Sequence, residues 1–347
     1  MSKYIYTLIC FIALSIMTSC TNKKQKQENV ARLNDSTTIT TEFGLPISAS
    51  LYKQYMFVFD FYGENGLMKV LDLKNKKIIK SFAYKGEGPN EVLSVGSFDC
   101  VSSEYGDFLY LFDPMTKKMQ IYAMDSLLSD SSRPIPIVQK KMPSKSRYME
   151  VLKTKNGYIA SGIIEDKKFV LLNDSLQECG SGGQYAKKPS EDIPNMTNVI
   201  ANNGKFFMSE DKKYIVNVIY LAGIISCYTF DDISNSISLK WENILTELDY
   251  TLHGESFVNN GTIGYLSAAM GKQYIYALYS GEKENTNENA TYGAEIHIYD
   301  YEGTLIKKYK IPTPAFCICV DEENHTLYAV THEPETAVIK YTLPEKL

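Results

Sequence analysis

The sequence predicts an all-β fold, a six-bladed β-propeller of four-stranded antiparallel blades. Apolar strand couplets recur six times at intervals of about 50 residues, a period typical of propeller blades. The 347 residues include 26 tyrosines and 15 phenylalanines but a single tryptophan, and this composition favours pleated strands. The sixth couplet lacks a fourth strand, which a segment near the N-terminus can supply. Together these observations predict a closed ring.

Each couplet corresponds to the second and third strands of one blade. In the first unit, residues 55–61 form one strand and residues 67–73 its partner, because the turn between them is rich in glycine and asparagine. Residues 77–84 then form the outer strand. The remaining couplets are predicted at 108–113 with 118–123, 157–163 with 168–173, 213–220 with 224–230, 273–280 with 295–301, and 326–332 with 337–343.

A shorter segment ahead of each couplet is the predicted innermost strand, next to the central channel. The sixth unit ends after its third strand, so residues 38–43 are expected to add the missing outer strand and remove an exposed sheet edge. The predicted innermost strands are 47–52, 97–102, 149–154, 198–203, 262–267 and 316–320.

The first twenty residues have the pattern of a secretory signal. Lys3 is followed by an apolar run, and the small residues Thr18 and Ser19 precede Cys20. Met17 to Cys20 resembles a bacterial lipobox, which implies a lipid on Cys20; the alternative is an ordinary signal peptide. The expected organisation is a signal peptide over 1–19, a polar tether over 20–37 and the propeller over 38–347.

The charge balance argues against a nucleic-acid-binding protein. The formal net charge is -5, and only three arginines occur among the 36 basic residues. Lysine lacks the planar fork with which arginine reads phosphates and bases. We therefore expect no nucleic-acid partner, and we expect a monomer that contacts a membrane through its lipid.

The most distinctive local motif is Lys85-Gly86-Glu87-Gly88-Pro89-Asn90-Glu91, after the outer strand of the first unit. With the lipobox and the repeated aromatic strands, it resembles the TolB-like six-bladed propeller lipoproteins of Bacteroides and its relatives. This resemblance implies a location in the cell envelope. The lack of an acidic cluster directly after Cys20 favours an anchor at the outer membrane that faces the periplasm. The motif is interpreted first as a structural turn, because glycine and proline carry no reactive groups. The alternative is a binding site formed by Lys85, Gly86, Gly88, Pro89, Asn90 and Glu91.

Two functions are compatible with the sequence. The first is a binding or scaffold module for an envelope protein, peptide or glycan, without a cofactor, because no convergent catalytic motif occurs. The second is a Ca²⁺-dependent hydrolase or lactonase, as the resemblance to other six-bladed propellers implies, with Glu91, Asn203 and Asp321 as metal ligands. Further acidic and amide side chains scattered over several blades are Asp60, Asp99, Glu150 and Asn202.

The cysteines and histidines give weaker evidence for a functional site. Cys317 and Cys319 are two residues apart on a predicted strand, so both side chains are expected on one face, packed in the core. The alternative is a pair of metal ligands, which lacks a nearby set of histidines or carboxylates. His297 lies in another predicted strand, where a solvent-facing or hairpin-stabilising role is expected.

Overall fold

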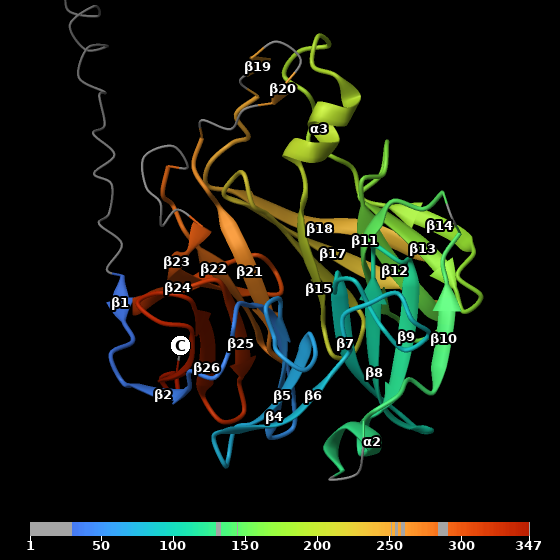
Figure 1. The fold of residues 1–347 in the computed structure, drawn as a ribbon. Helices are drawn as coiled ribbons and strands as arrows, with labels where there is room; N and C mark the ends of the chain where they lie inside the picture. The colour runs from blue at the N-terminus through green and yellow to red at the C-terminus, as the bar shows by residue number, and fades with distance from the viewer. Residues whose placement is uncertain are drawn as a thin grey trace, which may run out of the picture. The chain divides into compact units, whose positions relative to one another are not determined.

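Six antiparallel sheets follow one another along the chain and form the blades of a propeller (Figure 1). The structure, a computed structural model, describes residues 30–129, 133–143, 145–250, 252–253, 256–257, 261–283 and 291–346. The blades belong to one unit that runs from Ala31 to Leu347. The predicted six-bladed all-β fold is thus confirmed, while the predicted signal peptide and Cys20 lie outside the described residues.

The first strand of each blade is the innermost, and most innermost strands contact those of the neighbouring blades. In the first three blades the chain then runs outward through three further strands. These blades consist of β3 (Pro46–Tyr52), β4 (Tyr55–Asp60), β5 (Met68–Asp72) and β6 (Lys77–Phe82); β7 (Ser97–Ser103), β8 (Gly106–Asp113), β9 (Lys118–Ala123) and β10 (Val138–Lys141); and β11 (Tyr148–Lys153), β12 (Gly157–Gly162), β13 (Phe169–Asn173) and β14 (Glu178–Gly182).

The fourth and fifth blades follow the same order, and the sixth takes its outer strand from the other end of the chain. Two short helices and one small strand pair lie in the connections between these strands. The remaining elements are β15 (Gly204–Met208), β16 (Tyr214–Ile219), β17 (Ile224–Asp231) and β18 (Ser236–Ile244); β21 (Tyr265–Met270), β22 (Tyr274–Tyr279), β23 (Gly293–Asp300) and β24 (Leu305–Ala315); β25 (Cys317–Asp321), β26 (Thr326–Thr331), β27 (Ala337–Thr342) and β2 (Ser36–Thr40); and β1 (Ala31–Arg32), α2 (Met124–Leu128), α3 (Asn195–Ala201), β19 (Leu252–His253) and β20 (Ser256–Phe257).

The ring is closed by strand β2, which pairs antiparallel with β27 and so overlaps the segment predicted for this role. Ile39 on β2 is 7% exposed and packs between the sixth and first blades. Strand β1, which the sequence analysis did not predict, adds parallel to the outer strand of the fifth blade, with Ala31 opposite Tyr309. Strand pairing therefore begins before Thr38, within the stretch predicted as a tether.

Apolar side chains fill each gap between neighbouring blades, so six buried clusters form a ring. A small seventh cluster around Ile219 lies at one end of the fourth blade. The cluster at the closing gap contains Cys317 and Cys319, whereas Ile318 belongs to the cluster on the other side of the sixth blade. Alternate side chains of a strand point to opposite faces, and this alternation places both cysteines in the core as predicted. Burial on both faces explains why the strands are so rich in apolar and aromatic residues.

The Asp or Asn that ends many couplets has a structural role. At the end of β5, Asp72 Oδ1 accepts hydrogen bonds from the backbone N–H groups of Lys74 and Asn75, at 2.9 and 3.0 Å. Asn173, Asp231 and Asp300 cap the equivalent turns in the third, fourth and fifth blades. These side chains satisfy turn amides that the sheet leaves unpaired, which accounts for their recurrence in the sequence.

The prediction of an innermost strand at 198–203 is wrong. Most of this segment is the end of helix α3, and the innermost strand of the fourth blade is β15, which begins at Gly204. Asn198 and Asn202 hydrogen-bond to each other at 3.0 Å, as side chains one helical turn apart can. Within the described residues, neither helix is long or apolar enough to span a bilayer.

One end of the ring carries the longer connections, and we call it the loop face. Because strands alternate in direction, turns between second and third strands lie at the same end as connections between blades. Helix α3 and the pair β19–β20 belong to such connections and lie together at the top of Figure 1, whereas α2 lies at the opposite end.

Candidate functional site

The predicted motif forms a closed loop between β6 and β7 on the loop face. Gly86 N–H donates to Val92 O at 3.0 Å, and Glu91 N–H donates to Gly88 O at 3.2 Å. The Glu91 carboxylate turns back into the loop, where Oε2 accepts from Gly88 N–H at 3.0 Å. A Cβ at position 86 would lie 2.1 Å from this Oε2, so a larger residue here would displace the carboxylate.

Neighbouring strands hold the same loop from outside. Lys118 Nζ donates to Gly88 O at 3.0 Å, and Gln120 Nε2 donates to Glu91 O at 3.3 Å. Asn90 and Pro89 are exposed, and Asn90 Oδ1 accepts from Gln139 Nε2 at 2.8 Å. The exposed Lys85 lies with Nζ 5.8 Å from the centre of the Phe61 ring. These contacts support the structural-turn interpretation, while a ligand-binding role for these residues stays a prediction.

The structure does not bring the three predicted metal ligands together. The Glu91 carboxylate is engaged within its own loop, and Asp321 caps a turn by accepting from Asn324 N–H at 3.1 Å. Asn203 precedes the start of one innermost strand and Asp321 ends another, which places them at opposite ends of the channel. In the part of the chain that the structure describes, no group of three or more His, Cys, Asp or Glu side chains is arranged to hold a metal ion.

A cavity of about 440 Å³ opens at the channel mouth on the loop face. The innermost strands of the third, fourth and fifth blades line it, together with helix α3 and the turn after β16. Its polar side chains include Glu150, Asn203 and Lys205, and its apolar walls are Met149, Ile200, Leu221 and Leu266. A volume of this size and a largely apolar lining with few polar groups are typical of small-molecule sites. A second cavity, of about 260 Å³, is lined mainly by prolines and carries Glu333 as its charged residue.

A β-bulge in β11 positions Glu150 at this cavity. The register between β11 and β12 shifts between Tyr148 and Glu150, and the extra residue Met149 is 44% exposed. Gly96, which directly precedes β7 of the neighbouring second blade, allows this bulge, because a Cβ there would lie 2.0 Å from Met149 O. The bulge thereby points the Glu150 carboxyl group toward the neighbouring blade, where Oε2 accepts from Phe206 N–H at 3.3 Å.

The Glu150 carboxyl group is enclosed by protein but faces the cavity. Desolvation disfavours its charged form and raises its pKa to about 7, although the positive charge of Lys205 and the Phe206 amide oppose this effect. The group therefore changes charge near neutral pH. Perturbed carboxyl groups of this kind in a cavity are typical of functional sites.

Lys205 enters the same cavity from strand β15 of the fourth blade. Its Nζ lies 5.3 Å from the centre of the Phe316 ring, which precedes the innermost strand of the sixth blade. Phe316 in turn stacks on His332, with ring centroids 5.1 Å apart and an interplanar angle of 24°. The lysine thus reaches across the mouth toward an aromatic surface, a geometry that favours a cation–π contact.

Elsewhere the channel is crossed by an ion pair. Lys212 Nζ lies 2.7 Å from Asp99 Oδ2, and both side chains are largely buried. They belong to the fourth and second blades, which are not neighbours in the ring, so the pair spans the channel. Asp60, another of the scattered acids, accepts from the N–H groups of Gly44 and Leu45 at 3.0 and 2.6 Å. These acids are already engaged by the protein.

A buried polar network supports one wall of the cavity. The Tyr265 hydroxyl lies 2.9 Å from His297 Nδ1 and 2.7 Å from the Tyr299 hydroxyl. His297 Nε2 lies 3.2 Å from Glu295 Oε2, and this contact is the main reason that the Glu295 pKa is lowered. His297 is 1% exposed, so the expected solvent-facing role is wrong, whereas its stacking on Tyr279 of the paired strand β22 fits the expected hairpin-stabilising role. The sequence offered no local signal for a buried histidine that contacts two other strands of its own blade.

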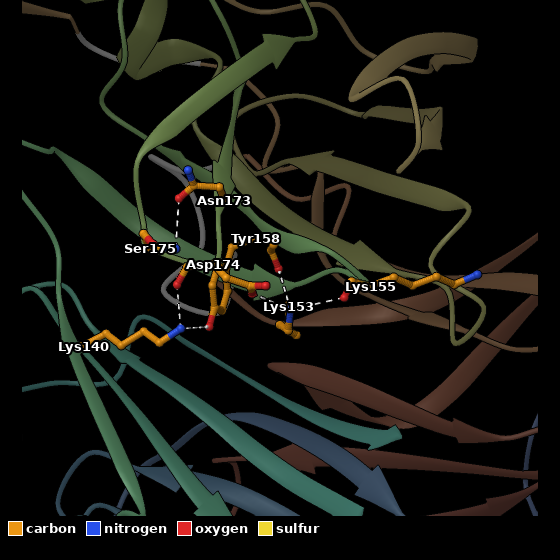
Figure 2. A network of polar contacts seen from close by, with 8 residues as sticks. Lys140, Lys153, Lys155, Tyr158, Asn173, Asp174 and Ser175 are labelled. Atoms are coloured by element: carbon orange, nitrogen blue, oxygen red, sulfur yellow. Dashed lines mark hydrogen bonds and ion pairs between the residues drawn. The ribbon is translucent and has the colours of Figure 1, made fainter. Parts of the chain in front are cut away.

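Near the opposite end of the third blade, Lys140 and Lys153 hydrogen-bond to turn residues and do not line the cavity. Figure 2 shows Lys153 Nζ donating to Asp174 Oδ1 at 3.1 Å and to the backbone oxygens of Gly157 and Lys155. In the same view, Lys140 Nζ donates to Asp174 O at 2.6 Å. These ammonium groups hold the turns of the blade together, so their hydrogen-bonding capacity serves the fold.

Sequence reasoning missed most of this site. Glu150 stood only among several scattered acids, and Lys205 was not singled out. Either could have been found by noting that an innermost strand directs alternate side chains toward the channel. The register needed for that step was not available, because the segment before β15 was predicted as the strand.

The fold and its cavity define the class of protein: a closed six-bladed propeller with a ligand-sized site at one channel mouth. The family model described as TolB-like 6-blade propeller-like matches residues 21–323, and the chain belongs to this family. No curated protein matches the chain.

Several solved structures share the fold at low sequence identity. A putative exported protein from Bacteroides fragilis has a TM-score of 0.57 and 10% identity, over 88% of this chain and 93% of that one. A member of the DUF4221 family from Bacteroides vulgatus has a TM-score of 0.53 and 10% identity, over 90% and 94%. The β-propeller domain of Cps50 (Swd1) from Myceliophteria thermophila has a TM-score of 0.52 and 12% identity, over 88% and 99%. At these identities the similarity establishes the fold alone.

Proposed function

We propose that this chain is an envelope-anchored, monomeric binding propeller that recognises its ligand or partner at the channel mouth. The observation that carries this proposal is the cavity of about 440 Å³ with Glu150 and Lys205 in its walls. Rigid rings that present loops and a cavity at one face are a common arrangement for recognition. A protein, peptide or glycan that inserts one small group into the cavity fits this arrangement.

The rim of the cavity supports recognition of a partner from outside. Met149 is 44% exposed and Ile200 is 46% exposed, although both are apolar and lie next to polar cavity residues. Exposed apolar side chains that border a cavity with a few polar groups are typical of binding surfaces. Their burial by a partner would add to the affinity that the cavity provides.

The anchoring part of the proposal rests on the leader sequence. The apolar run before Cys20 and the lipobox-like Met17 to Cys20 support lipidation, and the structurally similar Bacteroides fragilis protein is described as exported. We place the propeller in the periplasm, attached to the outer membrane. In a fractionation experiment, Cys20→Ser is expected to move the protein from the membrane to the soluble fraction, whereas Cys179→Ser is the matched control. Retention of Cys20→Ser in the membrane would contradict lipid anchoring.

The binding part is tested by filling the cavity. Ile200→Trp is expected to abolish most crosslinks between the full chain and other components of intact cell envelopes. Ile233→Trp is the matched control, because Ile233 is 93% exposed in a turn at the opposite end of the ring. Equal crosslinking of both variants and the unmodified protein would exclude the channel mouth as the recognition site.

The Ca²⁺-dependent hydrolase remains the alternative from the sequence. Of its three proposed ligands, Asn203 lines the cavity, but Glu91 and Asp321 contact other groups. No observation in the described residues favours this function over binding.

A further inference from the structure

A carboxyl group and an ammonium group face the cavity without forming an ion pair with each other. Glu150 and Lys205 come from the innermost strands of adjacent blades, and both line the same space. They are close enough for the lysine charge to act on the carboxyl group, yet they form no ion pair within 4.0 Å. A charged pair that is separated in an enclosed site is poorly stabilised by the protein alone.

Both groups keep hydrogen-bonding capacity for a ligand. Glu150 accepts a single bond from the described residues, the long one from Phe206 N–H, and only through Oε2. Lys205 Nζ makes a ring contact with Phe316 but has no hydrogen-bond acceptor among the described residues. By contrast, the largely buried ammonium group of Lys212 is paired with a carboxylate at 2.7 Å. Lys212, which has a structural role, is thus paired with an acceptor by the fold, whereas the donors of Lys205 are left for another partner.

The remaining walls indicate what lies between the charges. Ile200, Leu221 and Leu266 supply apolar surface, and Asn203 supplies an exposed amide beside them. Apolar walls favour an apolar side chain, and an amide can bond to a peptide group. A volume of about 440 Å³ accommodates a molecule of one or two amino-acid residues.

We propose that this cavity binds a small zwitterion, an apolar amino acid or dipeptide, with its carboxylate at Lys205 and its ammonium group at Glu150. The inference rests on the proposed binding function and adds the ligand class. A fatty acid would place a second negative charge beside Glu150, and a simple amine would place a second positive charge beside Lys205. A neutral sugar would leave both protein charges unpaired. The zwitterion satisfies both charges at once.

Blocked dipeptides test this assignment one charge at a time. The full-length protein is titrated calorimetrically with leucyl-leucine, with N-acetyl-leucyl-leucine and with leucyl-leucine amide. We expect the free dipeptide to bind at least about tenfold more tightly than either blocked form, because each block removes one charged contact.

Two variants assign each charge to its residue. In Glu150→Gln, N-acetylation should no longer weaken dipeptide binding, whereas amidation still should. In Lys205→Met, amidation should no longer weaken binding, whereas N-acetylation still should. Lys213→Met is the control, because its side chain is 67% exposed and outside the cavity. If a variant does not fold, as judged by its thermal melting, the comparison of the three dipeptides on the unmodified protein decides.

The outcomes separate this inference from the function on which it rests. Equal affinity for free and blocked dipeptides would overturn the inference. It would also be overturned if maltose or octanoate binds, no dipeptide binds, and Ile200→Trp abolishes the binding of maltose or octanoate. Either result would leave the channel mouth as a binding site. If none of these probes binds and Ile200→Trp keeps every envelope crosslink, both the inference and the proposed function fail.

Discussion

The loop from Lys85 to Glu91 and the cavity around Glu150 lie on the same face of the ring, and they use polar groups in opposite ways. In the loop, the Glu91 carboxylate accepts from the backbone 3.0 Å away, and neighbouring strands bind the loop carbonyls. In the cavity, Glu150 and Lys205 keep most of their bonding capacity. The comparison teaches that a conspicuous sequence motif can serve the backbone, while the groups free to bind a ligand are inconspicuous in the sequence.

The largest effect on stability is expected for Glu150→Gln, which removes the ionisable carboxyl group from the cavity. The Glu150 pKa is raised from 4.5 to about 7, so the folded state binds more protons than the unfolded state between these values. Stability contributed by this group is therefore lost as pH rises through that window. The difference in unfolding free energy between Glu150→Gln and the unmodified protein should therefore shift by about 2–3 kcal/mol in favour of the variant as the pH rises from 4 to 8.

Urea unfolding at several pH values measures this difference. Glu91→Gln is the matched control, because that carboxylate is stabilised by its own loop and not by a cavity. A pH-independent difference between Glu150→Gln and the unmodified protein would show that the cavity carboxyl group is solvated like a surface one, and the contrast between the two regions would disappear.

A smaller effect is expected from a methyl group in the loop. In Gly86→Ala, the new Cβ would lie 2.1 Å from Glu91 Oε2, so the carboxylate must move and its bond to Gly88 N–H is lost. We expect the unfolding free energy to fall by about 1–2 kcal/mol. Dipeptide binding at the cavity should not change. Glu87→Ala, at an exposed position of the same loop, should leave both quantities unchanged. Weaker dipeptide binding by Gly86→Ala would show that the loop and the cavity act together.

The smallest effect concerns Ca²⁺. The three residues proposed as ligands lie in a closed loop, in a cavity wall and at a turn at the far end of the channel. Millimolar Ca²⁺ is therefore expected to leave the melting temperature of the full chain unchanged within about 1 °C. A clear rise that Asn203→Ala abolishes and Asp321→Asn does not would indicate a metal site at the channel mouth and would favour the hydrolase.

The sequence by itself determined the ring. Apolar couplets with a regular spacing and capping Asp or Asn residues are local patterns, because strand burial and turn capping involve neighbours along the chain. The need to close a sheet edge also predicted a strand from the N-terminal region, which the structure shows as β2. Strand β1 was not predictable, because two residues that add parallel to the edge of another blade leave no periodic signal.

The tertiary structure alone decided the site. Glu150 and Lys205 line one cavity because the third and fourth blades are neighbours in the ring, and a bulge in β11 together with the start of β15 sets the direction of their side chains. His297 becomes a buried partner of Tyr265 because the pairing of β21, β22 and β23 within the fifth blade brings the two side chains together. Such contacts join residues far apart in the sequence, so they depend on register and closure. A one-residue change in register would turn each side chain to the other face of its strand.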